Sequence, residues 1–296
     1  MVSSFAPAAH EALLPYLAEE DRDAVPIPLD VSFSSVVVRL GGHVARIARN
    51  PDAQRGHHRE ALTLQVVAGR LPIAVPAPLR LIPTTQQLPF GAALQPYLAG
   101  RAMQANDAAR YPDIAEHMAQ TLRALHILPV DAFPDGALLD LDPEVEADRL
   151  WLQTEDHLES RLPPPSFRRV RERLSELRAQ TAAPRVICHG DPWFGNFLLA
   201  EDGSLVALLD FEDACTADPA FDLAATTYLS ERFVSTVLEV YRSGASESLP
   251  GDARELNGRI RAYRMIRELG GLAYCLRNGQ AEEAEHALRD VVEALG

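Results

Sequence analysis

The sequence predicts an α+β fold with two lobes, of which the first holds a small antiparallel sheet and the second is larger and mostly helical. Strand-like segments and a hairpin signal fill the part before residue 100, whereas from about residue 108 apolar residues recur at helical spacing. No internal repeat divides the 296 residues, a length that suits one large domain or two tightly joined lobes. We expect residues 1–97 to form the first lobe and residues 98–296 the second.

The first lobe is expected to contain antiparallel strands and one main helix. The β-branched run from Val36 to Val38 leads into Gly41-Gly42, which is a strong hairpin signal. Ala61 and Leu64 then recur at helical spacing, and Gly69 marks the end of that helix. The predicted strands cover 25–30, 35–40, 43–48 and 88–98, and the predicted helix covers 54–68.

The second lobe reads mainly as helices. Ile114, Met118, Leu122 and Leu125 share one helical face, which predicts a helix packed against the core. A further helix begins in the acidic stretch after Pro143, because negative charge suits a helix N-terminus. The remaining predicted helices begin near Ser166 or cover 232–242, 254–277 and 281–295.

Composition excludes several classes of function. The net charge of −14 discourages binding to nucleic acid. No apolar run approaches the roughly 20 residues needed to cross a bilayer, and Met1–His10 lacks the features of a signal peptide. The three cysteines show no disulfide framework or metal-ligand spacing. We therefore expect a cytoplasmic protein with no nucleic-acid or membrane partner.

The strongest local signal lies in residues 186–199. A short apolar strand leads into a polar loop with Asp191 and Asn196, and a second apolar strand follows. A third apolar segment ends at Asp210, so the three polar side chains can lie together. Carboxylate and amide oxygens suit magnesium better than zinc. A remaining carboxylate in such a loop can orient an attacking hydroxyl group.

This string resembles a known family. His189-x-Asp191-x-x-x-x-Asn196 followed by Asp210-Phe211-Glu212 looks like the catalytic and metal-binding motifs of aminoglycoside phosphotransferases, a branch of the protein-kinase-like fold. The resemblance implies that Asp191 aligns the acceptor hydroxyl and that Asn196 and Asp210 bind Mg²⁺. It also implies that His189 braces the loop.

Asp222 completes the resemblance. The segment 218–224, Asp-Pro-Ala-Phe-Asp-Leu-Ala, also looks like the family, and within it Asp222 would support the loop backbone from the first turn of a helix. The specific likeness covers residues 186–224, while the order of the lobes extends it over most of the chain.

The first lobe offers candidate phosphate contacts. The family's strand cation corresponds to Arg46, and the helix carboxylate that pairs with it corresponds to Glu60. The chain contains no lysine, so arginine must supply this charge, and a guanidinium can hold two phosphate oxygens. Ser34 and Ser35 belong to the loop expected over the phosphates, which contains no glycine.

The nucleotide base is expected to lie at the segment that joins the two lobes. Family members bind the base through backbone groups there, and the corresponding residues are Gln95, Tyr97 and Leu98. Pro96 has no N–H group and cannot donate. Tyr97 or Leu98 is therefore the expected donor.

The resemblance implies an enzyme that transfers the γ-phosphoryl group of ATP or GTP to a hydroxyl group of an aminoglycoside or macrolide antibiotic. Carboxylates in the second lobe would suit a cationic acceptor, and the candidates are Glu212, Asp213, Asp218, Glu231 and Glu268.

Three other hypotheses stay open at this point. The first is a kinase of a metabolic hydroxyl compound, such as a choline-like alcohol, a sugar or an amino-alcohol. The second is a non-catalytic nucleotide-binding relative, which the glycine-free loop would suit. The third is a metal-dependent hydrolase that uses His189 and the aspartates. It would need further histidines at ligand spacing, and His57-His58 are adjacent and lie in the other lobe.

Overall fold

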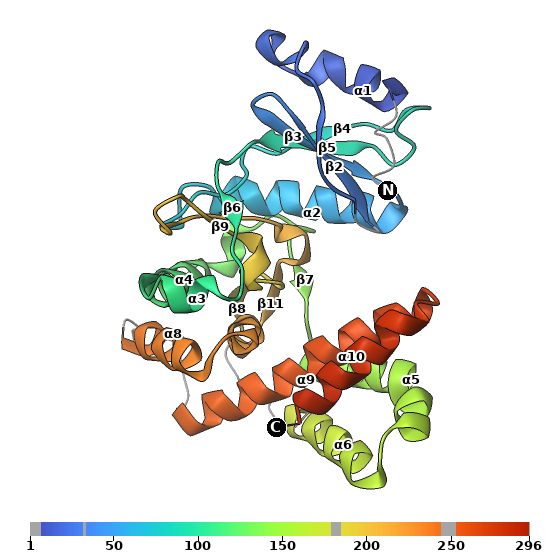
Figure 1. Cartoon of the computed structure of the whole chain (residues 1–296), viewed down its shortest axis with the longest axis vertical. Helices are drawn as coiled ribbons and strands as arrows, with labels where there is room; N and C mark the ends of the chain where they lie inside the picture. Colours follow the sequence, from blue (N-terminus) through green and yellow to red (C-terminus); the bar gives the residue numbers. More distant parts are fainter. Residues whose placement is uncertain (1–6, 32–33, 179–184, 244–252, 296) are drawn as a thin grey trace.

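The computed structural model of the chain describes residues 7–31, 34–178, 185–243 and 253–295. A sheet lies at the N-terminal end of the molecule, and helices make up most of the other end (Figure 1). The predicted α+β architecture is thus confirmed. None of the helices in the described ranges is both long and apolar enough to cross a bilayer.

The N-terminal sheet has five antiparallel strands in the order β1-β2-β3-β5-β4 (Figure 1). All four predicted strands are present in it. β4 is a fifth strand, in a proline-containing segment for which no strand is predicted. The five strands are β1 (Ile27–Val31), β2 (Ser35–Leu40), β3 (His43–Ala48), β4 (Arg80–Ile82) and β5 (Ala92–Pro96).

The hairpin between β2 and β3 depends on Gly41. This residue has a φ of +60°, and a Cβ atom on it would lie 1.9 Å from the Asp21 carboxylate. Asp21 in turn accepts a hydrogen bond from the Gly42 N–H at 3.0 Å. Only glycine tolerates both this conformation and this close approach. The turn is therefore fixed by a residue that precedes the sheet in the chain.

Helix α2 (Pro51–Val67) lies beside the sheet and faces the rest of the molecule (Figure 1). It begins three residues before the predicted start. Asn50 caps it by accepting from the Ala53 N–H at 2.9 Å, and Pro51 is at the first helical position. Glu60 on this helix is completely buried.

Most of the remaining chain is helical and surrounds two three-stranded sheets, β10-β9-β6 and β7-β11-β8. Short 3-10 turns complete the structure, and α1 precedes the N-terminal sheet without having been predicted. The strands are β6 (Arg101–Ala102), β7 (Leu139–Asp140), β8 (Val186–Cys188), β9 (Phe197–Leu199), β10 (Leu205–Leu208) and β11 (Cys215–Ala217). The helices are α1 (Pro7–Leu13), α3 (Asp107–Arg110), α4 (Asp113–His126), α5 (Pro143–Arg161), α6 (Pro164–Arg178), α7 (Ala220–Ala224), α8 (Glu231–Ser243), α9 (Ala253–Arg277) and α10 (Ala281–Glu293).

Two apolar cores hold these elements together. The smaller joins α1 to the five-stranded sheet through residues such as Leu13, Leu40 and Leu94. The larger fills the helical part and also takes Leu64 and Val67 from α2. Helix α2 thus lies against strands of the N-terminal sheet while its apolar face joins the larger core, so it links the two parts of the molecule.

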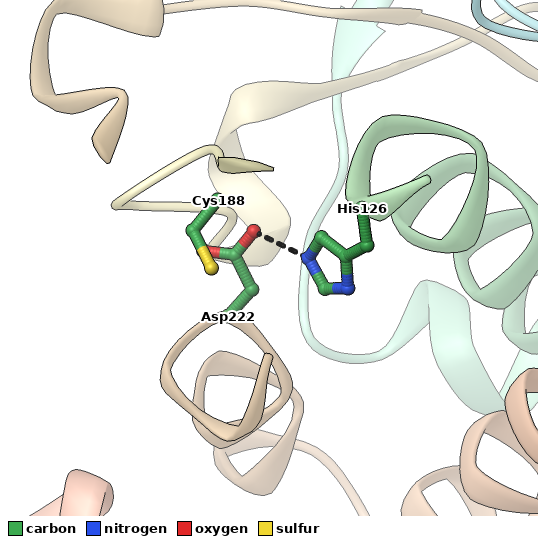
Figure 2. Close-up of side chains that lie close together, drawn as sticks. All are labelled: His126, Cys188 and Asp222. Carbon is green, nitrogen blue, oxygen red and sulfur yellow. Dashed lines mark hydrogen bonds and ion pairs between the residues drawn. The ribbon is translucent and has the colours of Figure 1, made fainter. Parts of the chain in front are cut away.

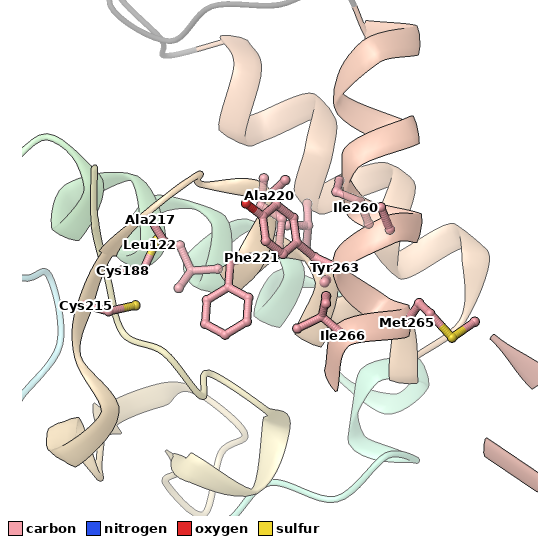
Figure 3. Packing of buried hydrophobic residues seen from close by; sticks show 14 of the residues in the cluster. Leu122, Cys188, Cys215, Ala217, Ala220, Phe221, Ile260, Tyr263, Met265 and Ile266 are labelled. Carbon is pink, nitrogen blue, oxygen red and sulfur yellow. The ribbon is translucent and has the colours of Figure 1, made fainter. Parts of the chain in front are cut away.

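Helix α9 runs through the larger core and packs against α7. The rings of Phe221 on α7 and Tyr263 on α9 lie edge to face with 5.6 Å between their centroids, and Ile266 packs beside them (Figure 3). Cys188 and Cys215, which lie opposite each other on the neighbouring strands β8 and β11, are buried in the same cluster. Burial raises the pKa of the Cys188 thiol. The core thus connects α9 directly to the elements that flank the polar loop after β8.

Candidate active site

The polar loop between β8 and β9 brings the predicted catalytic and metal-binding residues together. The side-chain amide of Asn196 donates to the Asp191 carbonyl at 2.8 Å. The Asn196 carbonyl accepts from the Leu209 N–H at 2.9 Å, which places Asp210 beside the loop. The side chains of Asp191 and Asp210 are 41% and 40% exposed. Both carboxylates can therefore reach a bound molecule.

His189 braces this loop from within. Its Nε2 donates to the Leu209 carbonyl at 2.9 Å, and its Nδ1 accepts from the Asp191 N–H at 3.2 Å. The imidazole also lies against the Phe211 ring, with 4.5 Å between the centroids. Both ring nitrogens are engaged by the backbone, so the geometry gives His189 no atom with which to bind a metal or act as a base.

Asp222 holds the backbone on the other side of the loop. It accepts hydrogen bonds from the N–H groups of His189 at 2.7 Å and Gly190 at 3.0 Å. Burial alone raises the pKa of Asp222, but the hydrogen bond and charge of His126 together with the His189 amide hold it below its usual value. A buried carboxylate with these partners is fully ionised near neutral pH.

His126, Cys188 and Asp222 form a buried cluster that has the composition of a metal site (Figure 2). The imidazole of His126 is nevertheless already engaged at both nitrogens. Its Nε2 contacts Asp222 at 3.0 Å, and its Nδ1 contacts the Tyr241 hydroxyl at 2.6 Å. This cluster is a hydrogen-bond network that supports the loop, and it offers no support for the hydrolase hypothesis.

Gly190 is required by the close packing of the loop. It has a φ of +91°, and a Cβ atom there would lie 2.0 Å from the Asp213 carbonyl oxygen. The arginine that protein kinases carry at this position of the motif has no room in this backbone. The difference from the kinase pattern is therefore steric.

Arg46 lies at the centre of a buried ion-pair cluster. Its guanidinium pairs with Glu60 on α2, and it also contacts Asp210 and Glu212 at 2.9 Å each. Burial alone lowers the pKa of Arg46, but these three carboxylates outweigh that effect and hold it above its ordinary value. The predicted strand cation and helix carboxylate are thus in direct contact.

Two further features tie this cluster to the segment Asp210-Phe211-Glu212. The second oxygen of Glu60 accepts from the Phe211 N–H at 3.1 Å. Asp210 is the one non-glycine residue with a positive φ, +69°, in the described chain. Strained backbone of this kind concentrates at functional sites. Burial and the nearby Asp210 charge raise the pKa of Glu212 to about 7, although Arg46 opposes the shift.

A cleft joins this cluster to the polar loop and to the segment that connects the lobes. It is lined by residues of the sheet, of the connecting segment and of the loop after β8. The lining includes most of the predicted nucleotide and metal residues, namely Ser34, Ser35, Arg46, Gln95, Tyr97, Leu98, Asn196 and Asp210. Residues separated by more than a hundred positions in the sequence thus share one cavity.

The phosphate loop is only partly described. Ser32 and Phe33 lie outside the described residues. Ser34 lines the cleft, whereas Ser35 is 2% exposed and its hydroxyl lies 3.4 Å from the Nε2 atom of His57. A contact between Ser35 and a phosphate group is therefore less direct than the sequence suggested.

The connecting segment distinguishes the two predicted donors to the base. The Tyr97 N–H already donates to the Gly42 carbonyl at 2.8 Å. The Tyr97 ring also stacks under Arg39, whose guanidinium carbon lies 3.7 Å from the ring centroid. Leu98 thus remains the candidate donor. Gln95 is 7% exposed, and its Oε1 atom finds no hydrogen-bond donor in the described part of the chain.

Comparisons with known proteins agree with this geometry. A model of the phosphotransferase enzyme family, APH, matches residues 23–256. The chain belongs to this family. The predicted small-molecule phosphotransferase with a kinase-like fold is thereby confirmed. None of the curated proteins compared matches the chain.

Solved structures show the same fold for the phosphotransferase. The GDP and kanamycin complex of APH(2″)-IIIa superposes with a TM-score of 0.83 at 16% identity, over 96% of this chain and 98% of that one. Macrolide 2′-phosphotransferase MphH from Brachybacterium faecium gives 0.68 at 22%, over 95% and 98%. A choline/ethanolamine kinase family protein from Mesorhizobium loti gives 0.71 at 20%, over 97% and 92%.

Sequence analysis missed one residue that contacts the phosphotransferase site. Arg267 on α9 forms an ion pair with the Asp191 carboxylate. It lies 76 positions after Asp191 and outside the motifs of residues 186–224. The only available signal was the position of a cation on one helical face, and such a cation is usually solvated.

The five acidic candidates for binding a cationic acceptor do not form one acidic surface. Glu212 pairs with Arg46, Asp218 with Arg259 at 2.8 Å, and Glu268 with Arg264. Only Asp213 and Glu231 are exposed. Most of the negative charge that was expected to bind the acceptor is thus neutralised within the phosphotransferase itself.

We predict that Gly190→Ala reduces both stability and phosphoryl transfer. The added methyl group meets the Asp213 carbonyl, and alanine at positive φ costs about 1–3 kcal/mol. Chemical denaturation and a transfer assay would measure the two effects. Gly271→Ala at an exposed position of α9 is the control, because nothing lies within 4 Å of a Cβ there and helical alanine stabilises by about 0.5–1 kcal/mol. Equal behaviour of the two variants would contradict the steric account.

We also predict that His57 makes the folded protein sensitive to acid. Burial, followed by the Arg46 charge, lowers the pKa of His57 to about 3. The unfolded chain binds this proton below about pH 6.5 and the folded chain does not until about pH 3, so stability falls as the pH falls through this window. At pH 5 this effect lowers the free energy of unfolding by about 2 kcal/mol relative to its value well above pH 6.5. His57→Gln should flatten the slope of unfolding free energy between pH 6.5 and 4.

His58→Gln provides the matched control for the pH measurement. His58 is the exposed neighbour of His57 on the same helix. Its removal should leave the slope in place. A slope that persists in His57→Gln and disappears in His58→Gln would contradict the prediction, because His58 would then cause the pH dependence.

Proposed function

We propose that the protein transfers the γ-phosphoryl group of ATP or GTP to a hydroxyl group of an antibiotic of the aminoglycoside or macrolide type. The observation that carries the proposal is the cleft lined by Arg46, Asn196 and Asp210, beside the loop that presents the accessible carboxylate of Asp191. The family supports a phosphotransferase. Relatives in complex with GDP and kanamycin support the nature of the donor and the acceptor.

Within this site, Asp191 aligns the acceptor hydroxyl and accepts its proton. Residues 1–97 and 98–296 would form the two lobes that enclose the nucleotide. The cation Arg46, held by Glu60, would contact the α- and β-phosphates, and Ser34 lies at the same end of the cleft. Leu98 and Gln95 would contact the base. Nearly all of the rate enhancement in such reactions comes from positioning and charge.

The donor set near Asp191 fits a magnesium ion. The Asn196 amide nitrogen donates to the Asp191 carbonyl, which leaves the amide oxygen for a cation, and Asp210 adds a carboxylate. Oxygen ligands of this kind suit Mg²⁺, which would neutralise charge on the nucleotide phosphates. These two residues would hold it. Because ATP and GTP are cytosolic, we also propose a cytoplasmic location.

The acceptor is proposed from the relatives and from the charges of the site. A kinase of a choline-like alcohol is the second candidate, supported by the fold it shares with the Mesorhizobium loti protein. The pairing of Glu212, Asp218 and Glu268 with arginines favours an acceptor with few positive charges. Among antibiotics this favours macrolides over polycationic aminoglycosides.

The first experiment measures nucleotide consumption and product mass with magnesium, ATP or GTP, and a panel of macrolides, aminoglycosides and small metabolic alcohols. We expect a phosphorylated antibiotic. Asp191→Asn should reduce kcat by about 10²- to 10⁴-fold, the usual contribution of a general base, while nucleotide binding persists.

Each other outcome contradicts the proposal in a distinct way. Turnover of a metabolic alcohol alone would replace the antibiotic with the second candidate. Tight nucleotide binding without turnover of any acceptor would favour a non-catalytic relative. Release of phosphate to water, with no phosphorylated alcohol, would indicate a hydrolase.

We predict that Gln95→Leu weakens nucleotide binding without slowing transfer at saturation. The buried Gln95 amide lines the cleft, and loss of one hydrogen bond costs about 0.5–1.5 kcal/mol. The KM for nucleotide should therefore rise up to about 10-fold, while kcat stays near that of the wild type. Competition between ATP and GTP measures how selectively the wild type and Gln95→Leu bind each nucleotide. An unchanged KM for both nucleotides would remove Gln95 from the base site.

A further inference from the structure

Arg267 reaches the catalytic loop from α9. Its Nη2 atom pairs with Oδ1 of Asp191, and its Nη1 atom donates to the Gly190 carbonyl at 3.2 Å. One planar guanidinium thus contacts both the carboxylate of Asp191 and the backbone just before it. Two contacts from one rigid group fix direction as well as distance.

The environment of Arg267 restricts its movement. The side chain is 12% exposed, and its guanidinium carbon lies 5.9 Å from the ring centroids of both Phe221 and Tyr228. Burial alone lowers the pKa of Arg267, but the Asp191 carboxylate, together with the Tyr228 hydroxyl beside it, raises it above its ordinary value. Phe221 belongs to α7, which also carries the loop support Asp222. The cation therefore stays charged and in place.

The two carboxylate oxygens of Asp191 differ in their hydrogen-bond partners. Oδ1 is bound to Arg267, whereas Oδ2 has no hydrogen-bond donor among the described residues. The carboxylate is 41% exposed, so this second oxygen can meet an acceptor. A neighbouring cation makes a carboxylate a weaker base. The effect of the pair on catalysis must therefore be orientation, which is what phosphoryl transfer mainly requires.

We propose that Arg267 is a positioning residue that fixes Oδ1 of Asp191 to the protein and so presents Oδ2 to the acceptor hydroxyl. The proposal rests on the phosphotransferase function described above. In the reaction, the acceptor O–H bond breaks and its proton passes to Oδ2. The acceptor oxygen forms a bond to the γ-phosphorus, and the bond from that phosphorus to the β–γ bridging oxygen breaks to release the nucleoside diphosphate.

The kinetic test compares Arg267→Lys, Arg267→Ala and the wild type with the acceptor that the panel identifies. We expect kcat to fall about 10²-fold in Arg267→Ala, as for a misplaced catalytic group, with the KM for nucleotide unchanged. Lysine keeps the charge but not the two-point contact, so its kcat should be intermediate. Guanidinium at low concentration should restore part of the activity of Arg267→Ala.

Arg261→Gln is the control for loss of a positive charge. Arg261 is an exposed arginine on the same helix. This variant should retain the wild-type kcat. A kcat equal to or above that of the wild type in Arg267→Ala would overturn the proposal and show that the ion pair holds Asp191 away from the acceptor. A rise in the KM for acceptor alone would make Arg267 a binding residue instead.

A second measurement needs no acceptor. Amide hydrogen exchange of the wild type and Arg267→Ala, each with magnesium and a bound nucleotide, reports how firmly the loop is held. We expect faster exchange at Asp191 and Asn196 and unchanged exchange in the N-terminal sheet. Unchanged exchange in the loop would contradict the proposal that Arg267 holds Asp191 in place, even if transfer were observed. Conversely, faster exchange without turnover of any acceptor would support this role of Arg267 and contradict the proposed function.

Discussion

The structure depends on the compensation of one buried positive charge. Arg46 lies in β3 with almost no access to water, and an isolated charge there would cost several kcal/mol. Its partners come from α2 and from the segment after β10. The sheet, the helix and the second lobe must therefore assemble around it. The same requirement places Asp210 at the edge of the cleft.

A second buried charge has the same role for the catalytic loop. Asp222 is completely buried, and the N–H groups of His189 and Gly190 together with His126 satisfy its carboxylate. Removal of one member of such a network leaves the others without partners, which costs more than the bond itself contributes. The direction of Asp191 thus depends on buried residues that do not line the cleft. Arg267 adds a third constraint from α9.

The sequence was informative wherever a structural feature is formed by residues close together in the chain. The strand and helix patterns predicted the sheet, α2 and α9, and the motifs predicted that Asp191, Asn196 and Asp210 lie near one another. The apolar pattern places the start of α2 too late, because the helix begins with the polar cap Asn50 and with Pro51 at its first position. Arg267 could not be predicted, because its position depends on how α9 packs against α7 and no local pattern encodes that packing.

The net charge of −14 illustrates the same limit, because a total does not reveal where charges are paired. The chain has no lysine, and arginine favours close pairs with carboxylates. Three of the five acids expected near the acceptor are held in such pairs. An acidic protein can therefore have few unpaired carboxylates among the residues proposed to meet the acceptor. Selection of the acceptor would then rest on shape and on the direction of Asp191 rather than on attraction between opposite charges.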